Sequence, residues 1–257
     1  MSRTVLITGA SGGLGLELAK LFAKDGYRLV LVARSEDKLY AIKTYLESQY
    51  HTEVDVVVKD LSRVNAAMDI FRYTKERRIE VDILINNAGF GDFGSFAGTD
   101  LDKQSDMAQV NMIALMQLCH LYVRPMIRRG NGKILNMASV AAFEPGPLMA
   151  VYYASKAFVL SFSEALSVEL KGTGVTVTAL CPGPTKTGFE EHANLGSSGL
   201  FKHLKNANAA EVAKYGYKKM KQRRVVAVPG LMNKAVVAAV HFLPRTVVRH
   251  LVYTIQK

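Results

Sequence analysis

Tyr152 and Lys156 stand four positions apart in the stretch Tyr152-Tyr153-Ala154-Ser155-Lys156. If Tyr152 opens a helix, both side chains share one face, because residues i and i+4 stack along a helix. A phenol with a pKa near ~10 exchanges protons poorly at neutral pH, and a nearby ammonium lowers that pKa by favouring the phenolate. The spacing alone also fits a surface helix without chemistry. The pair therefore predicts an acid–base catalyst only if other elements place it in a site.

Tyr153 is the alternative to Tyr152 as the proton donor. Its neighbour one helical turn on is Ala157, which offers no charge, so helix geometry favours Tyr152. Among the six histidines, His120, His203 and His241 show no spacing typical of a metal site. We therefore expect no bound metal.

The length and composition predict one large α/β domain. The chain has 257 residues, of which 49% are hydrophobic and 21% charged, as in ordinary globular proteins. Two cysteines, Cys119 and Cys181, are too few for a disulfide scaffold and indicate a reducing compartment. The apolar run after Arg3 is too short for the core of a signal peptide, and no apolar run reaches about 18 residues. A cytoplasmic location is expected.

The net charge of +11 lies in the last fifth of the chain. Residues 202–257 hold 12 Lys and Arg but a single acid, Glu211, whereas residues 1–201 hold 21 residues of each sign. Such a segment indicates either an anionic neighbour or a solvated face.

A glycine-rich turn near the N-terminus predicts a phosphate-binding site. Residues 4–8 resemble a buried strand, and a helical pattern follows Gly15. Glycines let the turn approach a pyrophosphate closely, and the helix N-terminus supplies free N–H groups. The spacing of Gly9, Gly13 and Gly15 departs from the G-x-G-x-x-G fingerprint, so a plain glycine turn remains an alternative.

Arg34 follows the second predicted strand, residues 28–33, where no carboxylate stands at the strand's end. An acidic residue there would bond the 2′-hydroxyl of NAD, whereas Arg accommodates the 2′-phosphate of NADP. The sequence therefore favours NADP(H), with NAD(H) as the alternative. Arg34 could also cap the helix expected at residues 36–49.

Strands and helices alternate along the rest of the chain, which predicts a doubly wound parallel sheet. Further strands are expected at residues 54–59, 81–85, 133–138, 175–180 and 225–228, and one long helix at 101–129. Functional groups gather at the carboxyl ends of such strands. Asp60, Asn86, Ser139 and Pro182 all stand there, and Asn111 is an amide inside the long helix.

With these pieces in order, residues 1 to about 230 resemble the short-chain dehydrogenase/reductase family. The matching motifs are Thr8-Gly9-x3-Gly13-x-Gly15, Asp60, Asn86-Asn87-Ala88-Gly89, Asn111, Ser139, Tyr152-x3-Lys156 and Pro182-Gly183. The resemblance implies a Rossmann-type sheet with strand order 3-2-1-4-5-6-7 and a nicotinamide cofactor. The ending, with Pro229-Gly230-Leu231 and Leu243-Pro244-Arg245, is similar to that of the ketoacyl reductase and 17β-hydroxysteroid dehydrogenase sub-group.

The resemblance also implies roles for individual residues. Tyr152 would be the general acid, or the base in reverse; Lys156 would lower its pKa; Ser139 would polarise the carbonyl; and Asn111 would anchor a proton-relay water. Ser155 and Ser161 are weaker alternatives to Ser139. The expected cofactor-binding positions are Gly9, Ser11, Gly12, Gly13, Leu14, Gly15, Arg34, Asp60, Leu61, Asn87, Ala88, Gly89, Tyr152, Lys156, Pro182, Gly183 and Thr185.

Apolar residues around the expected site favour a lipophilic substrate. Phe93, Phe143 and Met149 are the predicted pocket residues, and residues 184–215 are expected to form a lid over the substrate. Residues 1–230 would then be the catalytic domain. The remaining residues, 231–257, would form a helical extension that packs on the domain or at an interface.

The sequence therefore predicts an NADP(H)-dependent reductase or alcohol dehydrogenase acting on a lipophilic ketone or 3-oxoacyl substrate. A homo-oligomer, dimer or tetramer, is expected, without a nucleic-acid partner. Two alternatives remain: an NADP(H)-sensing regulator without turnover, and a peripheral membrane protein with secondary reductase activity. The apolar run at 231–243 spans only ~20 Å as a helix, so a protein contact is favoured over a membrane surface.

Overall fold

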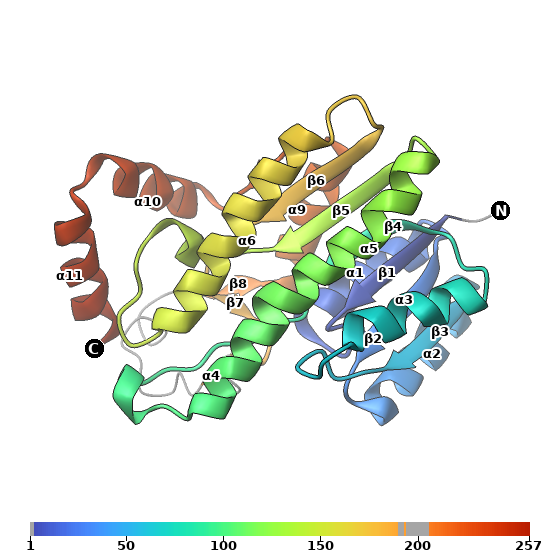
Figure 1. Ribbon diagram of the computed structural model, residues 1–257, viewed down its shortest axis with the longest axis horizontal. Helices are drawn as coiled ribbons and strands as arrows, with labels where there is room; N and C mark the ends of the chain where they lie inside the picture. The colour runs from blue at the N-terminus through green and yellow to red at the C-terminus, as the bar shows by residue number, and fades with distance from the viewer. Residues whose placement is uncertain (1–2, 190–192, 194–205) are drawn as a thin grey trace.

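A seven-stranded parallel sheet runs through the molecule (Figure 1). The computed structural model describes residues 3–189, 193 and 206–257. The strand order is β3-β2-β1-β4-β5-β6-β9, which confirms the predicted order, with β9 in the place of the seventh strand. The strands are β1 Thr4–Thr8, β2 Arg28–Ala33, β3 Val54–Val58, β4 Val81–Asn86, β5 Gly132–Met137, β6 Val175–Leu180 and β9 Val226–Ala227.

Helices cover both faces of this sheet, because alternate strand residues point to opposite sides. On β1, Leu6 belongs to the core shared with α3, α5 and α6, whereas Val5 and Ile7 belong to the core shared with α1, α2 and α9. The covering helices are α1 Gly13–Lys24, α2 Glu36–Tyr50, α3 Ala66–Glu76, α5 Leu115–Arg128, α6 Ala150–Glu169 and α9 Ala209–Lys221.

The helix predicted over residues 101–129 consists of three segments. They are α4 Leu101–Ala108, the π-helical segment η2 Gln109–Ala114 and α5. A π turn inserts one residue into the helical repeat and frequently marks a functional site. Asn111 lies within η2, and its amide bonds to neighbouring elements. The predicted long helix is therefore present, and its hydrogen-bond pattern changes from α to π at the position of the unusual amide.

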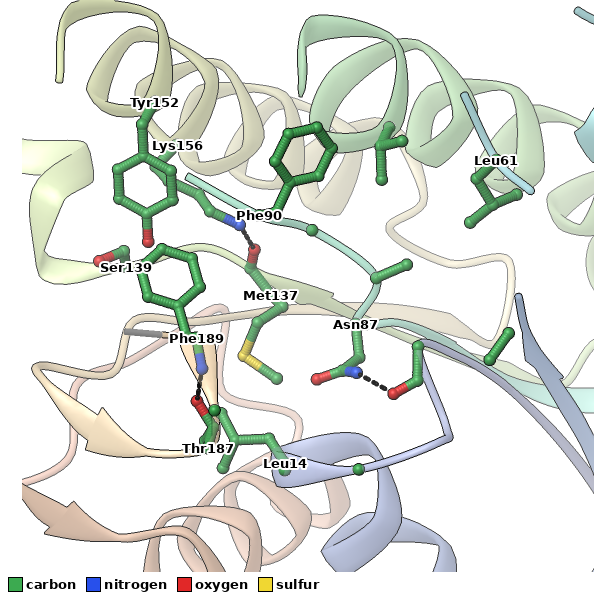
Figure 2. A pocket seen from close by; sticks show the side chains of 18 of the residues that line it. Leu14, Leu61, Asn87, Phe90, Met137, Ser139, Tyr152, Lys156, Thr187 and Phe189 are labelled. Atoms are coloured by element: carbon green, nitrogen blue, oxygen red, sulfur yellow. Dashed lines mark hydrogen bonds between the residues drawn. The ribbon is translucent and has the colours of Figure 1, made fainter. Parts of the chain in front are cut away.

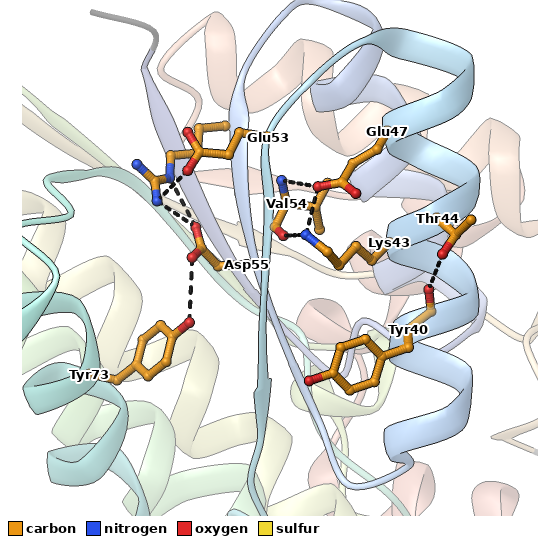
Figure 3. A network of polar contacts seen from close by, with 9 residues as sticks. Tyr40, Lys43, Thr44, Glu47, Glu53, Val54, Asp55 and Tyr73 are labelled. Carbon is orange, nitrogen blue, oxygen red and sulfur yellow. Dashed lines mark hydrogen bonds and ion pairs between the residues drawn. The ribbon is translucent and has the colours of Figure 1, made fainter.

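Ion pairs and hydrogen bonds of side chains connect the edge strand β3 to its neighbours (Figure 3). Arg28 forms ion pairs with Glu53 at 2.7 Å and Asp55 at 2.9 Å, and Asp55 also accepts a bond from the Tyr73 hydroxyl. On the outer side, Glu47 of α2 accepts the backbone N–H of Val54 at 3.2 Å. These contacts satisfy edge groups that would otherwise be open to another strand.

Two helices at the C-terminus, α10 Leu231–Phe242 and α11 Arg245–Gln256, extend from the end of the molecule opposite β2 and β3 (Figure 1). Val248, Val252 and Gln256 of α11 are buried, whereas α10 buries none of its residues. Val248 and Val252 belong to a third hydrophobic cluster with Met149 and Tyr153. None of the helices within the described residues is long and apolar enough to cross a bilayer.

The remaining short elements surround the carboxyl edge of the sheet. They are the 3-10 turns η1 Phe96–Gly98 and η3 Val140–Phe143, and the two-stranded sheet of β7 Thr185–Lys186 and β8 Ala207–Asn208. Of the predicted lid, 184–215, residues 190–192 and 194–205 lie outside the described part of the chain.

Candidate functional site

A cavity of about 930 Å³ opens at the carboxyl ends of the strands. The glycine turn after β1 lies at one side of it, and Tyr152, Ser139 and Lys156 lie together at another (Figure 2). The sequence places these groups in the cavity because parallel strands end at one edge of the sheet. Most predicted site residues line it: Gly9, Ser11, Gly12, Gly13, Leu14, Arg34, Asp60, Leu61, Asn87, Ala88, Gly89, Ser139, Met149, Tyr152, Lys156, Pro182, Gly183 and Thr185.

The glycine turn has a shape that side chains would prevent. Gly9 and Gly13 adopt φ of 64° and 52°, in the left-handed region that favours glycine. Gly15 lies in the first turn of α1, where a Cβ would come within 2.2 Å of the Gly9 carbonyl oxygen. The end of β1 and the start of α1 therefore lie as close together as their backbones allow. Gly13 and Leu14, in the first turn of α1, line the cavity, where the free N–H groups of a helix start can bind an anion.

Asn87, which follows β4, holds this turn in place. Its side-chain amide donates to the carbonyl oxygens of Thr8 at 3.0 Å and Gly9 at 3.1 Å. The Thr8 hydroxyl in turn accepts the backbone N–H groups of Asn87 and Ala88, each at 3.0 Å. The ends of β1 and β4 are thus tied together by side chains as well as by the sheet.

Cations line the cavity where β2 and β3 end. Arg34 is exposed directly after β2, Lys38 follows in the first turns of α2, and Lys59 follows β3 and pairs with Asp69 at 3.1 Å. Asp60 also lines the cavity and accepts the N–H of Ser62 at 3.0 Å. The positive groups beside Arg34 give this end of the cavity a chemistry suited to a phosphate.

Lys156 is buried beside Tyr152. Its ammonium donates to the Met137 carbonyl oxygen at 2.9 Å (Figure 2) and lies 5.6 Å from the centroid of the Tyr152 ring. Burial lowers the pKa of Lys156 to about 8. One turn of α6 therefore does bring the two groups together on one face, as the spacing predicts.

The pKa of Tyr152 differs from the expected direction. Burial raises it to about 12, and the hydrogen bond with the Ser139 hydroxyl partly opposes that rise. Lys156, whose ammonium donates to the Met137 carbonyl oxygen, does not lower the pKa of Tyr152 below its ordinary value as the spacing predicts. At neutral pH the phenol is protonated and able to donate.

Ser139 links Tyr152 to the end of β6. It stands between the end of β5 and the start of η3, and the residue is only 8% exposed. Its hydroxyl oxygen accepts the Ala141 N–H at 3.1 Å and its O–H lies 3.4 Å from the Pro182 carbonyl oxygen. Figure 2 shows the phenol of Tyr152 directed toward this hydroxyl. A donor pair converging on one point is the arrangement that polarises a carbonyl.

Asn111 lies behind the cavity wall rather than in it. Its amide group exchanges hydrogen bonds with the backbone of Phe90, at 3.0 and 3.1 Å, and donates to Ser155 at 3.0 Å. A Cβ on Gly89 would lie 2.9 Å from the Asn111 amide oxygen and 3.3 Å from the Lys156 nitrogen. The π turn therefore brings Asn111 close to Lys156, with Gly89 leaving the space between them.

Three other predicted residues do not line the cavity in the described structure: Gly15, Phe93 and Phe143. Gly15 acts through its contact with Gly9. Phe93 packs against the third hydrophobic cluster, and Phe143 packs on the core of α5 and α6 with its ring centroid 6.1 Å from that of His241. The two phenylalanines therefore pack in the hydrophobic clusters and do not form part of the cavity wall that the described residues make.

Several lining residues were not predicted. Lys38 and Lys59 are cations near the predicted Arg34, so proximity in sequence to a strand end could have indicated them. Tyr153 lines the cavity beside Tyr152, although the sequence argument considered it only as a rival acid. Phe189, whose ring centroid is 5.3 Å from that of Tyr152, lies within the predicted lid, residues 184–215, but was not among the predicted pocket residues (Figure 2). Among the described residues, no three His, Cys, Asp or Glu side chains form a metal site.

The parallel sheet, the glycine turn and the site at its carboxyl edge define a Rossmann-type, nucleotide-binding protein. The family model for short chain dehydrogenase matches residues 3–197, and the chain belongs to that family. A very-long-chain 3-oxoacyl-CoA reductase of Anas platyrhynchos is 35% identical over 181 residues, which cover 69% of this chain and 58% of the relative. Other relatives are named ketoacyl reductase and 17-beta-hydroxysteroid dehydrogenase, in agreement with the expected sub-group.

Solved structures of similar fold contain either nicotinamide nucleotide. A short-chain dehydrogenase from Sphingobium yanoikuyae in complex with NADPH has a TM-score of 0.85 and 31% identity, covering 93% of this chain and 92% of its own. A short chain dehydrogenase/reductase from Burkholderia phymatum in complex with NAD has a TM-score of 0.82 and 25% identity, covering 92% of both chains. The fold thus accommodates NADPH in one neighbour and NAD in another.

Proposed function

We propose that the chain is an NADP(H)-dependent oxidoreductase that interconverts a lipophilic ketone and its secondary alcohol. The observation that carries the proposal is the convergence of Tyr152, Ser139 and Lys156 in the same cavity as the glycine turn and Arg34. The glycine turn has the shape to approach a pyrophosphate, which supports a dinucleotide there. The bound nicotinamide would supply or accept the hydride, and the chain's own residues would handle the proton.

In the direction of reduction, the protonated Tyr152 hydroxyl would donate its proton to the carbonyl oxygen, and Ser139 would hydrogen-bond the same oxygen. The raised pKa of Tyr152 supports the donor role, because the phenol keeps its proton at neutral pH. Lys156 would stabilise the phenolate left behind. Asn111 would orient the groups that return a proton, since it lies close to Lys156 across Gly89.

A lipophilic substrate is supported by the wall next to Tyr152. Met149, Tyr153 and Phe189 line the cavity there, and all three contribute to the third hydrophobic cluster. The relatives named for 3-oxoacyl-CoA and 17-beta-hydroxysteroid substrates support the same class. We propose a 3-oxoacyl or steroid-like ketone as the substrate, with residues 184–215 closing over it.

The proposal divides the chain into a catalytic domain, residues 1–230, and an extension, residues 231–257. It includes a homo-oligomer, dimer or tetramer, because α10 exposes Leu231 and Phe242 at 85% and 88%, a surface that an apolar contact would cover. Both cysteines are free and buried, which suits the reducing cytoplasm that we expect.

Turnover of a panel of ketones tests this function. Purified protein with NADPH is given cyclohexanone, a steroid 17-ketone and a 3-oxoacyl-CoA, and the loss of NADPH absorbance is followed. We expect turnover of at least one lipophilic ketone. Binding of NADPH without turnover of any ketone or alcohol would contradict the proposal and favour the nucleotide-sensing alternative.

The preference for NADP(H) has a separate test. Arg34→Asp should reverse the preference, because a carboxylate repels the 2′-phosphate and accepts the 2′-hydroxyl of NAD. Lys24→Asp makes the same change in charge on the far end of α1 and should leave the preference unchanged. If Arg34→Asp still prefers NADPH, Arg34 does not select the cofactor.

A further inference from the structure

Tyr153 is held on three sides in the cavity wall. Its ring meets that of Tyr152 edge-on, with centroids 6.0 Å apart and planes at 76°. The backbone of Gly146 lies directly against the ring, because a Cβ at Gly146 would come within 2.2 Å of it. The hydroxyl oxygen accepts a hydrogen bond from the Gln256 side-chain amide at 2.8 Å. Tyr153 therefore has little freedom to move away from Tyr152.

Gln256 reaches Tyr153 from the other end of the sequence, 103 residues away. It is the last residue of α11 and is fully buried, with 0% of its surface exposed. Val248, Val252 and Gln256 are spaced at i, i+4 and i+8, so they share one face of the helix. The two valines pack in the third hydrophobic cluster with Met149 and Tyr153, next to the site.

The helix α11 lies behind the cavity wall, against residues that line the cavity. Tyr153 and Met149 line the cavity, whereas no residue of α10 or α11 does so in the described structure. Burying an amide is costly unless it is hydrogen-bonded. Within the described residues the Gln256 nitrogen bonds Tyr153, whereas the Gln256 side-chain oxygen is buried without a partner, so the bond to Tyr153 is the one polar contact that holds this amide. The same bond holds the hydroxyl of Tyr153, whose ring lines the cavity beside that of Tyr152.

We infer that Gln256 is a positioning residue that determines substrate size through Tyr153. The inference rests on the proposed function. A purely structural alternative is that Gln256 only attaches the C-terminal helix to the domain. The two differ in what changes when the bond is removed, because a positioning residue alters the choice between substrates while the fold and the cofactor site stay intact.

The first experiment replaces Gln256 by leucine, which keeps the size of the side chain and removes its donor. Initial rates with NADPH are measured on cyclohexanone and on a steroid 17-ketone. We expect the ratio of the two kcat/KM values to change by about fivefold or more, mainly through KM, as for changes of wall contacts in other enzymes. Thr254→Val, an exposed position two residues earlier, is the matched control and should keep the ratio within about twofold.

A double-mutant cycle shows whether the effect passes through Tyr153. Tyr153→Phe removes the hydroxyl that accepts the bond, so combining it with Gln256→Leu should change the ratio no further than the larger single variant does. A ratio unchanged in Gln256→Leu would overturn the inference, and so would two single effects that simply multiply in the double variant.

A measurement that does not depend on turnover separates the inference from the proposed function. Wild-type protein that reduces no ketone would defeat the proposed function. Hydrogen exchange of the peptide covering residues 144–156 would still report on the positioning. Gln256→Leu should raise the exchange rate of this peptide without changing the thermal midpoint of the protein. Thr254→Val should leave both the exchange rate and the thermal midpoint as in the wild type. Exchange of this peptide that is unchanged in Gln256→Leu would overturn the inference.

Discussion

The end of the cavity that we propose for the cofactor, at the glycine turn of residues 9–15, differs in construction from the end that we propose for the substrate, at Tyr152. We call them the cofactor end and the substrate end. At the cofactor end, the backbone of Gly15 lies close against that of Gly9, and the Asn87 side chain bonds the backbone carbonyl oxygens of Thr8 and Gly9. At the substrate end, side chains carry the geometry, and two of them, Tyr152 and Lys156, are ionisable groups with strongly shifted pKa values. One end depends on shape and the other on buried polar groups.

Because of this difference, the two ends contribute differently to the stability of the fold. A closely packed turn stabilises the fold and presents N–H groups at the same time, so function and stability agree there. A buried ammonium such as Lys156 lowers stability, and its retention indicates a use other than holding the fold. Substitutions at the cofactor end should therefore damage folding, and substitutions at the substrate end should damage chemistry while sparing or improving stability.

The largest effect is expected from Tyr152→Phe. The change removes the proton donor, and loss of general acid catalysis reduces kcat about 10³-fold. Binding of NADPH, followed by its fluorescence, should stay within about twofold because the glycine turn is untouched. Tyr153→Phe is the matched control and should keep kcat on a small ketone within about tenfold. If Tyr152→Phe also abolished NADPH binding, the two ends would not be separable.

The glycine pair Gly15 and Gly12 tests the cofactor end. A Cβ at Gly15 would lie 2.2 Å from the Gly9 carbonyl oxygen, whereas a Cβ at Gly12 would meet nothing within 4 Å in the described structure. Overpacking of this kind costs about 3 kcal/mol, so Gly15→Ala should shift urea unfolding strongly. Gly12→Ala, at an extended φ of 176°, should unfold like the wild type. Equal unfolding of the two variants would contradict a backbone-shaped cofactor end.

The cofactor end was the more predictable of the two from sequence. Its strands are continuous apolar runs and its turn is marked by Gly9, Gly13 and Gly15, because local backbone requirements restrict residue type. The parallel sheet then brings the strand ends together without further information. The same reasoning placed Tyr152 and Lys156 on one face of a helix and beside Ser139.

What escaped prediction depends on contacts between distant segments. Nothing near Phe143 in the sequence reveals that α10 approaches it and that its ring packs away from the cavity. The bond between Tyr153 and Gln256 joins residues 103 positions apart, and the π turn at Asn111 is visible only as an amide in a helical pattern. The lowered pKa of Lys156 likewise follows from burial, which a four-residue spacing does not specify.

Lys156→Met should stabilise the protein at neutral pH while it removes activity. The pKa of Lys156 is about 8 in the folded chain against an ordinary value of 10.5, so burying the ammonium costs about 3 kcal/mol below pH 8. The variant also loses the hydrogen bond to Met137, which contributes about 1 kcal/mol, so its free energy of unfolding should exceed that of the wild type by about 2 kcal/mol.

The dependence on pH has a definite sign for this variant. Between pH 8 and 10.5 the unfolded wild type binds more protons than the folded one, so wild-type stability rises with pH in that window. The advantage of Lys156→Met should therefore be largest below pH 8 and fade toward pH 10.5. Urea unfolding at pH 7 and pH 10 measures it. A less stable variant at pH 7 would mean that Lys156 holds the fold.

The smallest effect is expected from Glu144→Gln, at the outer part of the substrate end beside Tyr153. Burial raises the pKa of the Glu144 carboxyl above its ordinary 4.5, so the folded chain binds the proton more tightly than the unfolded chain does. Wild-type stability should fall as the pH rises from 4.5 through that raised pKa. Glutamine stays neutral, so the thermal midpoint of the variant should exceed that of the wild type by up to ~2 °C at pH 8 and match it at pH 4.

Glu80→Gln is the matched control for Glu144→Gln, because Glu80 is exposed in the loop before β4. Its thermal midpoint should follow the wild type at both pH values. A lower midpoint for Glu144→Gln at pH 8 would mean that the ionised carboxylate has a stabilising partner. In that case this part of the substrate end would be held by charge, as the edge strand β3 is held by Arg28 and Asp55, and the contrast between the two ends would be confined to Tyr152 and Lys156.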